Sequence, residues 1–212
     1  LRHKGFTVLR LFSLSIGLAG CLLVALYILH EISYDRFNVN ADETYRIVEQ
    51  MQRADGFSRV RSTTGVPLGP IVRENIPAVK KIVRYGVMGG IIANSDRVFR
   101  ENGLAFVDPD FLTLFTFPLA QGDSLTVLKN PFEVVISQEA AKKYFGDEPP
   151  LGKTLLWNNR QPLTVTGVLA AIPTNSHLRF DMLISFATLS RTIRDWDEHW
   201  DAGVATYVQL DR

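Results

Sequence analysis

Residues 12–29 read FSLSIGLAGCLLVALYIL and contain no charged side chain. An α-helix rises about 1.5 Å per residue, so crossing a hydrocarbon core of about 30 Å takes roughly 20 residues. Extending the run back to Val8, past Arg10, meets that length. An arginine near the end of a span can reach the headgroups with its charged end. The stretch therefore predicts a transmembrane helix.

The charges on the two sides of this run predict its orientation. Arg2, Lys4 and Arg10 lie on the N-terminal side, whereas Glu31 and Asp35 follow the run, with one arginine beyond them. Basic flanks stay in the cytoplasm, so we expect a cytoplasmic N-terminus and an extracytoplasmic remainder. The leader, residues 1–11, has apolar side chains among basic ones, and we expect it to lie along the inner interface as a short amphipathic segment.

Three other interpretations of the apolar run were weighed. A buried core helix rarely reaches this length behind a basic leader. A cleaved signal peptide has a shorter apolar region, followed by a small-residue cleavage site. Residues 18–21, LAGC, resemble a bacterial lipobox, in which Cys21 would be lipidated, but residues 22–29 stay apolar where a mature lipoprotein has a polar tether. We expect Cys21 to lie with Gly17 and Gly20 on a helix face that another helix can approach closely.

Composition limits what the rest of the chain does. With 46% hydrophobic and 21% charged residues and a net charge of +1, the chain should fold and has no basic field to attract nucleic acid. The single cysteine excludes an intrachain disulfide and a multi-cysteine metal site. The chain begins at Leu1 rather than Met, and we expect it to be a fragment of a longer protein, truncated at its C-terminal side.

After the span, the sequence predicts a mixed arrangement of strands and helices. The helix should continue from residue 30 through residue 37 and end near residues 38–40, so residues 30–43 form a helical extension and linker. Asp55-Gly56 and Asn102-Gly103 are strong hairpin signals. Strands are expected at residues 44–51, 59–63, 82–85, 97–100, 104–107, 133–136, 154–157, 163–169, 182–184 and 206–210.

Helices are expected at residues 67–75, 110–115, 138–145 and from 185 to about 196. Asp108-Pro109 reads as a cap and first-turn pair for the second of these helices, Ser137 as the N-cap of the third and Gly146 as its end. Because no regular strand–helix–strand period appears, the predicted class is α+β.

Signals for catalysis or ligand binding are weak. Residues 146–154, GDEPPLGKT, resemble a phosphate-binding loop, but the spacing is wrong and a helix precedes where a strand is needed. The histidines His3, His30, His177 and His199 show no metal-ligand spacing. The acidic and aromatic residues 195–201 are typical of a solvated helix end with two tryptophan anchors, with a calcium or partner site as the alternative. We expect no catalytic, cofactor-binding or metal-binding residue and no enzyme activity.

Several segments, taken together, resemble a known family. They are RHKGFT at residues 2–7, LSIGLA at 14–19, EISYDRF at 31–37, VIS at 135–137, AAKKYFG at 140–146, PLGK at 150–153, VTGVL at 165–169, IPTNSH at 172–177 and FD at 180–181. In this order they are similar to FtsX-like and MacB-like ABC transporter permeases.

The resemblance implies a permease of four membrane helices, of which residues 12–29 are the first, with residues 44–212 forming a periplasmic core domain. That domain would have one lobe from residues 44–86 and 180–212 and an inserted lobe from residues 91–179, where substrate contacts are expected.

The resemblance also implies partners: an ABC ATPase subunit or fused domain, a second permease protomer and the bilayer of the inner (plasma) membrane, with a periplasmic adaptor or outer-membrane component left open. ATP hydrolysis in the cytoplasm would drive export or extraction of a periplasmic substrate. The alternatives are the sensor domain of a membrane-bound signalling protein and a lipoprotein binding module.

Overall fold

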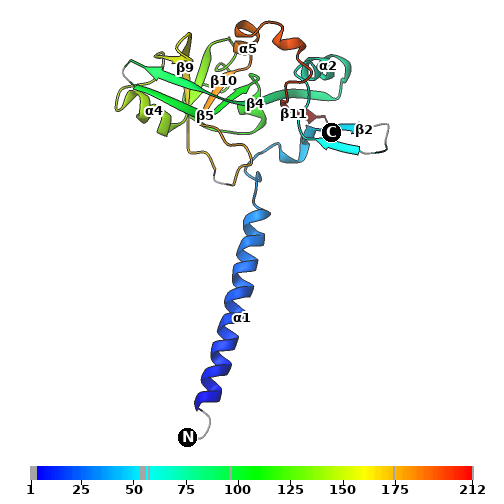
Figure 1. Cartoon of the computed structure of the whole chain (residues 1–212), viewed down its shortest axis with the longest axis vertical. Coiled ribbons are helices and arrows are strands. Elements are labelled where there is room, and N and C mark those ends of the chain that lie inside the picture. Colours follow the sequence, from blue (N-terminus) through cyan, green and yellow to red (C-terminus); the bar gives the residue numbers. More distant parts are fainter. Residues whose placement is uncertain (1–3, 53–55, 57, 96, 174, 212) are drawn as a thin grey trace.

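The computed structural model describes residues 4–52, 56, 58–95, 97–173 and 175–211. It consists of a long helix, α1 (Lys4–Glu31), that projects from a β-rich domain (Figure 1). Residues Gly5–Glu31 have a mean hydropathy of 2.3 and none of this surface is buried by the domain, so by length and composition the helix can cross a membrane. Residues 4–11 belong to this same helix rather than to a separate interfacial segment.

The predicted continuation of the helix through residue 37 is wrong, because α1 ends at Glu31. Ile32 N–H still bonds to Ile28 O at 2.9 Å, but Ser33 and Tyr34 then bond three residues back. Asp35 takes a left-handed conformation, with φ of 57°, and its N–H donates to Asn175 O in the core domain at 2.9 Å. A tertiary contact thus ends the helix where the local sequence contains no Gly or Pro. A short 3₁₀ turn, η1 (Ala41–Glu43), follows.

The core domain is built on one mixed sheet of nine strands among the described residues, with the path β1-β11-β4-β5-β10-β7-β9-β6, while β8 pairs with β4 and β9. The pairs β10–β5 and β7–β9 are parallel and the others antiparallel. This confirms the α+β class. The strands are β1 (Thr44–Ile47), β4 (Val79–Asn94), β5 (Arg97–Val107), β6 (Leu119–Gln121), β7 (Glu133–Ile136), β8 (Thr154–Trp157), β9 (Gln161–Leu169), β10 (Met182–Ser185) and β11 (Ala205–Leu210).

The remaining elements are short. Strands β2 (Glu49–Gln52) and β3 (Ser58–Arg61) form the predicted hairpin as a separate ribbon, and its Asp55 turn residue lies outside the described residues. The helices are α2 (Leu68–Asn75), α3 (Phe111–Leu114), α4 (Gln138–Phe145), α5 (Ala187–Thr192) and the 3₁₀ turn η2 (Trp196–Glu198).

Alternating side chains of the central strand β5 enter two different cores. Leu104 and Phe106 pack in one buried cluster, and Ala105 and Val107 pack in another. Successive strand residues point to opposite faces of a sheet, so the two clusters lie on its two sides. The helix α3 contributes Phe111 to the second cluster, on the side that also receives the chain from the membrane helix through Phe37.

Local signals around α4 and β8 are confirmed. The Ser137 hydroxyl accepts a hydrogen bond from Ala140 N, and Gly146 ends the helix with φ of 65°. Asn158 and Asn159 both have positive φ in the tight turn between β8 and β9. The stretch from Gly146 to Thr154 joins a helix to a strand, which is the reverse of a phosphate-binding loop.

The predicted hairpin at Asn102-Gly103 is wrong, because both residues lie inside the continuous strand β5. The chain instead reverses between β4 and β5, next to Ser95, whose φ is 48°. Gly103 serves a close approach, since a Cβ there would lie 2.5 Å from Asp181 Oδ2, and its carbonyl accepts from Asp181 N. The sequence signal for a turn was therefore a signal for packing against a neighbouring strand.

Two other boundaries differ from the predictions. Strand β10 includes Ser185, and helix α5 ends at Thr192, with Ile193 extended, so Trp196 lies in a separate 3₁₀ turn. Strand β4 runs without interruption across the predicted boundary between the lobes at residues 86–91. The division into two lobes stays a prediction, and one sheet connects the residues assigned to them.

Candidate functional site at the junction of the membrane helix and the core domain

The turns that follow α1 are docked on the loop that precedes β10. Asn175 Nδ2 donates to Ser33 O at 2.8 Å, and Asp35 N donates back to Asn175 O at 2.9 Å. The Asp35 carboxylate accepts from His177 N at 3.1 Å and contacts His177 Nδ1 at 2.6 Å. These partners are 142 residues apart in the chain, and both belong to segments that carry the family resemblance.

The histidine joins this contact to the central sheet. A carboxylate only accepts hydrogen bonds, so His177 Nδ1 is the protonated nitrogen that faces Asp35. When the ring is neutral, its Nε2 accepts from the hydroxyl of Tyr207 on β11, 2.9 Å away. When the ring is charged, Nε2 donates to the same oxygen. The relay Asp35–His177–Tyr207 is therefore satisfied in both protonation states.

A cavity of about 290 Å³ opens beside this relay. Asn38 lines it and is only 9% exposed. Its Nδ2 donates to Asp35 O at 3.0 Å, whereas its Oδ1 has no hydrogen-bond partner among the described residues. Its lining residues are Asp35, Asn38, Ala41, Thr44, Arg46, Phe115, His177 and Tyr207.

Burial raises the pKa of the Tyr207 hydroxyl, and the two charged residues of the cavity act on it in opposite directions: Arg46 lowers the pKa and Asp35 raises it. The Arg46 guanidinium lies over the Tyr207 ring, 5.6 Å from its centroid. The cavity therefore has a cation and a carboxylate within electrostatic reach of one hydroxyl.

A second set of contacts ties the same segment to α3. Asn40 Nδ2 donates to Thr113 O at 3.1 Å and to Leu114 O at 3.2 Å, so it covers carbonyls at the end of this one-turn helix. Val39 N donates to Thr116 Oγ1. The Phe37 ring packs on Phe117 with centroids 5.6 Å apart. The segment after the membrane helix is thus held by two separate parts of the core domain.

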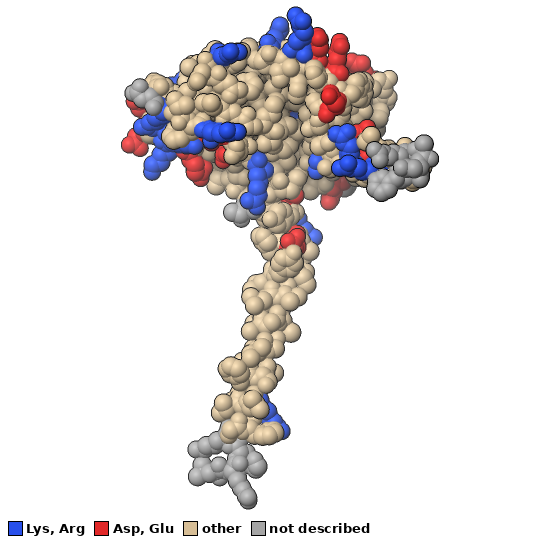
Figure 2. Space-filling model, in the orientation of Figure 1, with Lys and Arg blue, Asp and Glu red and all other residues tan. Residues whose placement is uncertain are grey.

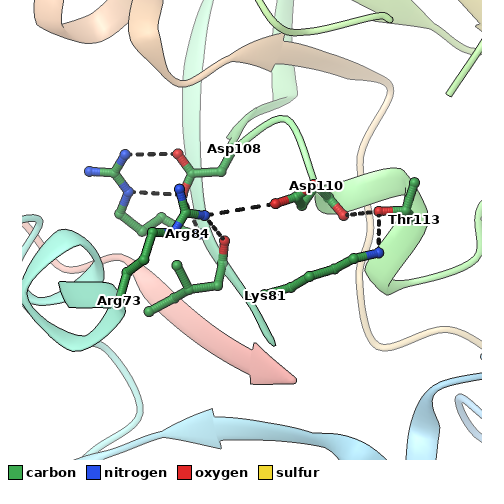
Figure 3. A network of polar contacts seen from close by, with 7 residues as sticks. Arg73, Lys81, Arg84, Asp108, Asp110 and Thr113 are labelled. Atoms are coloured by element: carbon green, nitrogen blue, oxygen red, sulfur yellow. Dashed lines mark hydrogen bonds and ion pairs between the residues drawn. The ribbon is translucent and has the colours of Figure 1, made fainter. Parts of the chain in front are cut away.

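From α3, polar contacts continue to β4 and α2 (Figure 3). Lys81 Nζ on β4 donates to Thr113 Oγ1 at 2.9 Å. Arg73 of α2 lies 3.7 Å from the Asp110 carboxylate and donates to Ile82 O. These groups connect the element that holds Asn40 to the longest strand of the sheet.

The strongest contact in this region is the ion pair between Arg84 and Asp108. Asp108 Oδ2 accepts from Arg84 N at 2.8 Å and from Nε at 2.9 Å, and Oδ1 accepts from Nη2 at 2.7 Å (Figure 3). Both side chains are 13% exposed, and the guanidinium stacks on Phe186 at 4.0 Å. The prediction that Asp108 caps the following helix is wrong, because the arginine uses both of its carboxylate oxygens.

Other predicted candidates lie away from the junction. His3 lies outside the described residues, the His30 ring packs edge-on against Tyr34, and His199 Nδ1 contacts Asp195 O. Cys21 is exposed on α1. Within the described ranges, no group of three His, Cys, Asp or Glu side chains could hold a metal ion, residues 195–201 included.

Figure 2 shows the surface of α1 almost free of charged side chains between its two ends, while charges of both signs cover the core domain. The fold and the junction define a class of protein, in which an α+β domain is carried on an apolar helix long enough to span a membrane. Comparison with known proteins places the chain within this class.

The model of the MacB-like periplasmic core domain family matches residues 7–212. The chain belongs to this family of periplasmic domains from ABC transporter permeases, which are components of transporters. No significant match was found among proteins with curated descriptions.

Solved structures share the fold. A domain of a permease protein from Porphyromonas gingivalis is 22% identical, with a TM-score of 0.70, covering 82% of this chain and 76% of that chain. The periplasmic region of MacB from Actinobacillus actinomycetemcomitans is 20% identical, with a TM-score of 0.58 and coverage of 80% and 75%. The extracellular domain of the ABC-type transporter YknZ from Gram-positive bacteria is 18% identical, with a TM-score of 0.56 and coverage of 80% and 84%.

Proposed function

We propose that this chain is the N-terminal part of the permease subunit of an ABC transporter, and that it couples ATP hydrolysis by a cytoplasmic partner ATPase to export or extraction of a periplasmic substrate. The observation that carries the proposal is the direct connection, in one chain, of a membrane-length helix to a MacB-like periplasmic core domain. In this arrangement the N-terminus is cytoplasmic, the core domain is periplasmic, and a second permease protomer completes the transporter.

The junction suggests how motion passes from the helix to the domain. A continuous helical extension does not exist, since α1 ends at Glu31. The turns at residues 32–40 are instead held on one side by Asn175 and His177 and on the other side by the carbonyls of α3. A displacement of α1 therefore acts on the sheet at two points, through Tyr207 on β11 and through Lys81 on β4.

The proposal is tested in the full-length permease, produced with its ATPase partner and reconstituted in vesicles. Inserting three glycines within residues 38–40 lengthens and softens the connection, and we expect ATP hydrolysis to continue while transport is lost. The same insertion at residues 123–124, an exposed turn of the core domain, is the control and should leave transport intact. Unaltered transport after the first insertion would refute the coupling role.

The gene itself provides a second test, because a permease of this kind requires three further apolar spans. A second span followed directly by a helical linker and a kinase or cyclase domain would instead identify a membrane-bound sensor.

A further inference from the structure

We propose that the junction cavity binds the headgroup of a phospholipid of the phosphatidylethanolamine type, with the ammonium group near Asp35 and Asn38 and the phosphate near Arg46. This inference concerns a lipid site on the chain itself and does not depend on the ATPase partner or on the transported substrate. It stands on the position of the cavity, on its unpartnered acceptor and on its pair of opposite charges.

The position follows from the length of α1. The candidate span of 27 residues is about 40 Å long at about 1.5 Å per residue, which exceeds a hydrocarbon core of about 30 Å. The end of the helix at Glu31 therefore reaches the headgroup layer. The first lining residue, Asp35, follows only four positions later, so the cavity opens at the depth where phospholipid headgroups are abundant.

The acceptor is Asn38 Oδ1. Its amide orientation is determined by Nδ2, which donates to Asp35 O, so the oxygen is the atom left without a partner. A buried acceptor without a donor costs free energy, and a ligand that carries N–H groups removes this cost. A primary ammonium carries three such donors, whereas the quaternary ammonium of choline carries none.

The opposite charges favour a zwitterion. Asp35 and Arg46 both line the cavity, and both act on the Tyr207 hydroxyl. The Arg46 Nε donates to Ser62 O, and the rest of a guanidinium offers further N–H donors in a geometry that suits phosphate. The rings of Phe115 and Tyr207, with centroids 4.9 Å apart, form an apolar wall. A volume of about 290 Å³ holds a headgroup and excludes the acyl chains.

The test uses the whole chain in nanodiscs that contain equal amounts of phosphatidylethanolamine and phosphatidylcholine with identical acyl chains. Native mass spectrometry after release from the disc counts the lipids that each protein retains. We expect a preference for phosphatidylethanolamine of about tenfold, the worth of one good hydrogen-bonded contact. The variant Arg46→Gln should lose the preference, whereas Arg59→Gln, which removes an exposed arginine from the β2–β3 ribbon, should keep it.

Further arms separate the alternatives. Asn38→Leu should also abolish the preference, and circular dichroism shows whether this variant folds; the outcome for Arg46→Gln stands independently of it. Equal retention of both lipids would overturn the proposal and leave the cavity with water only. Equal retention of phosphatidylglycerol, which lacks an ammonium group, would also overturn it, as would equally tight binding of soluble phosphoethanolamine in the absence of a bilayer.

Discussion

Two carboxylate contacts join distant parts of this chain, and their surroundings differ. The Arg84–Asp108 pair is 13% exposed on both sides and is stacked on Phe186. In the Asp35–His177 pair the side chains are 31% and 38% exposed, and a cavity lies beside them. A buried bidentate pair cannot rearrange without leaving an unpaired charge in the interior, whereas a partly solvated pair can exchange its contacts with water.

This difference separates the contact that stabilises the fold from the contact that can change during function. The network of Figure 3 holds α2, β4 and α3 as one unit. The junction attaches the membrane helix to that unit through groups that water can reach. Four predictions test this comparison, in order of decreasing effect.

The largest effect is expected from Arg84→Met. It leaves the Asp108 carboxylate buried without its partner, and breaking such a pair costs about 3–5 kcal/mol. Urea denaturation followed by circular dichroism measures the loss in the free energy of unfolding. The double variant Arg84→Met with Asp108→Leu should recover much of that loss. A loss below about 1 kcal/mol in the single variant would place this pair among surface ion pairs.

A smaller effect on stability is expected from Asp35→Ala. The pair is partly exposed, so the loss should be about 1 kcal/mol or less. Hydrogen exchange should nevertheless become faster in residues 33–40, because the carboxylate holds the backbone of His177 and orients its ring. Asp147→Ala, at an exposed aspartate, is the matched control. Unchanged exchange at the junction would show that Asn175 alone docks this segment.

The third prediction concerns Asp181, a carboxylate without a buried arginine partner. Burial, together with the nearby Glu101, raises its pKa above the ordinary value of 3.8. The folded state therefore binds this proton more tightly than the unfolded state, and the free energy of unfolding falls as the pH rises from about 3.8 through the folded-state pKa. Asp181→Asn should remove this part of the pH dependence and slightly raise stability at neutral pH. A fall that persists in the variant would assign it to another group.

The smallest effect is expected at alkaline pH. Burial raises the pKa of Tyr85 from 10.0 to about 12, so the free energy of unfolding should fall as the pH rises from about 10 to about 12. Ultraviolet difference spectroscopy follows tyrosinate formation, and the late-titrating component should be smaller in Tyr85→Phe. The Tyr85 hydroxyl donates to Arg179 O, close to the loop that docks the membrane helix. Titration of Tyr85 near pH 10 would contradict its burial.

The elements that were predicted correctly depend on contacts between neighbours in sequence. Ser137 caps α4 and Gly146 ends it because these roles need only a hydroxyl and a positive φ within one helix. The asparagines at the turn between β8 and β9 act in the same local way. The predicted errors have the opposite origin, since Asn102-Gly103 and Asp108 carry strong local signals that long-range partners override.

The sequence alone determined the membrane-length helix, the α+β class and the family, because a long apolar run and a set of ordered motifs survive without knowledge of contacts. Only the tertiary structure decided where that helix ends and what receives it. Asp35 and His177 are 142 residues apart, and each reads as an ordinary polar loop residue by itself. Their meeting depends on the sheet that brings Tyr207 and the loop before β10 beneath the helix, and folding of the whole domain is required to bring them together.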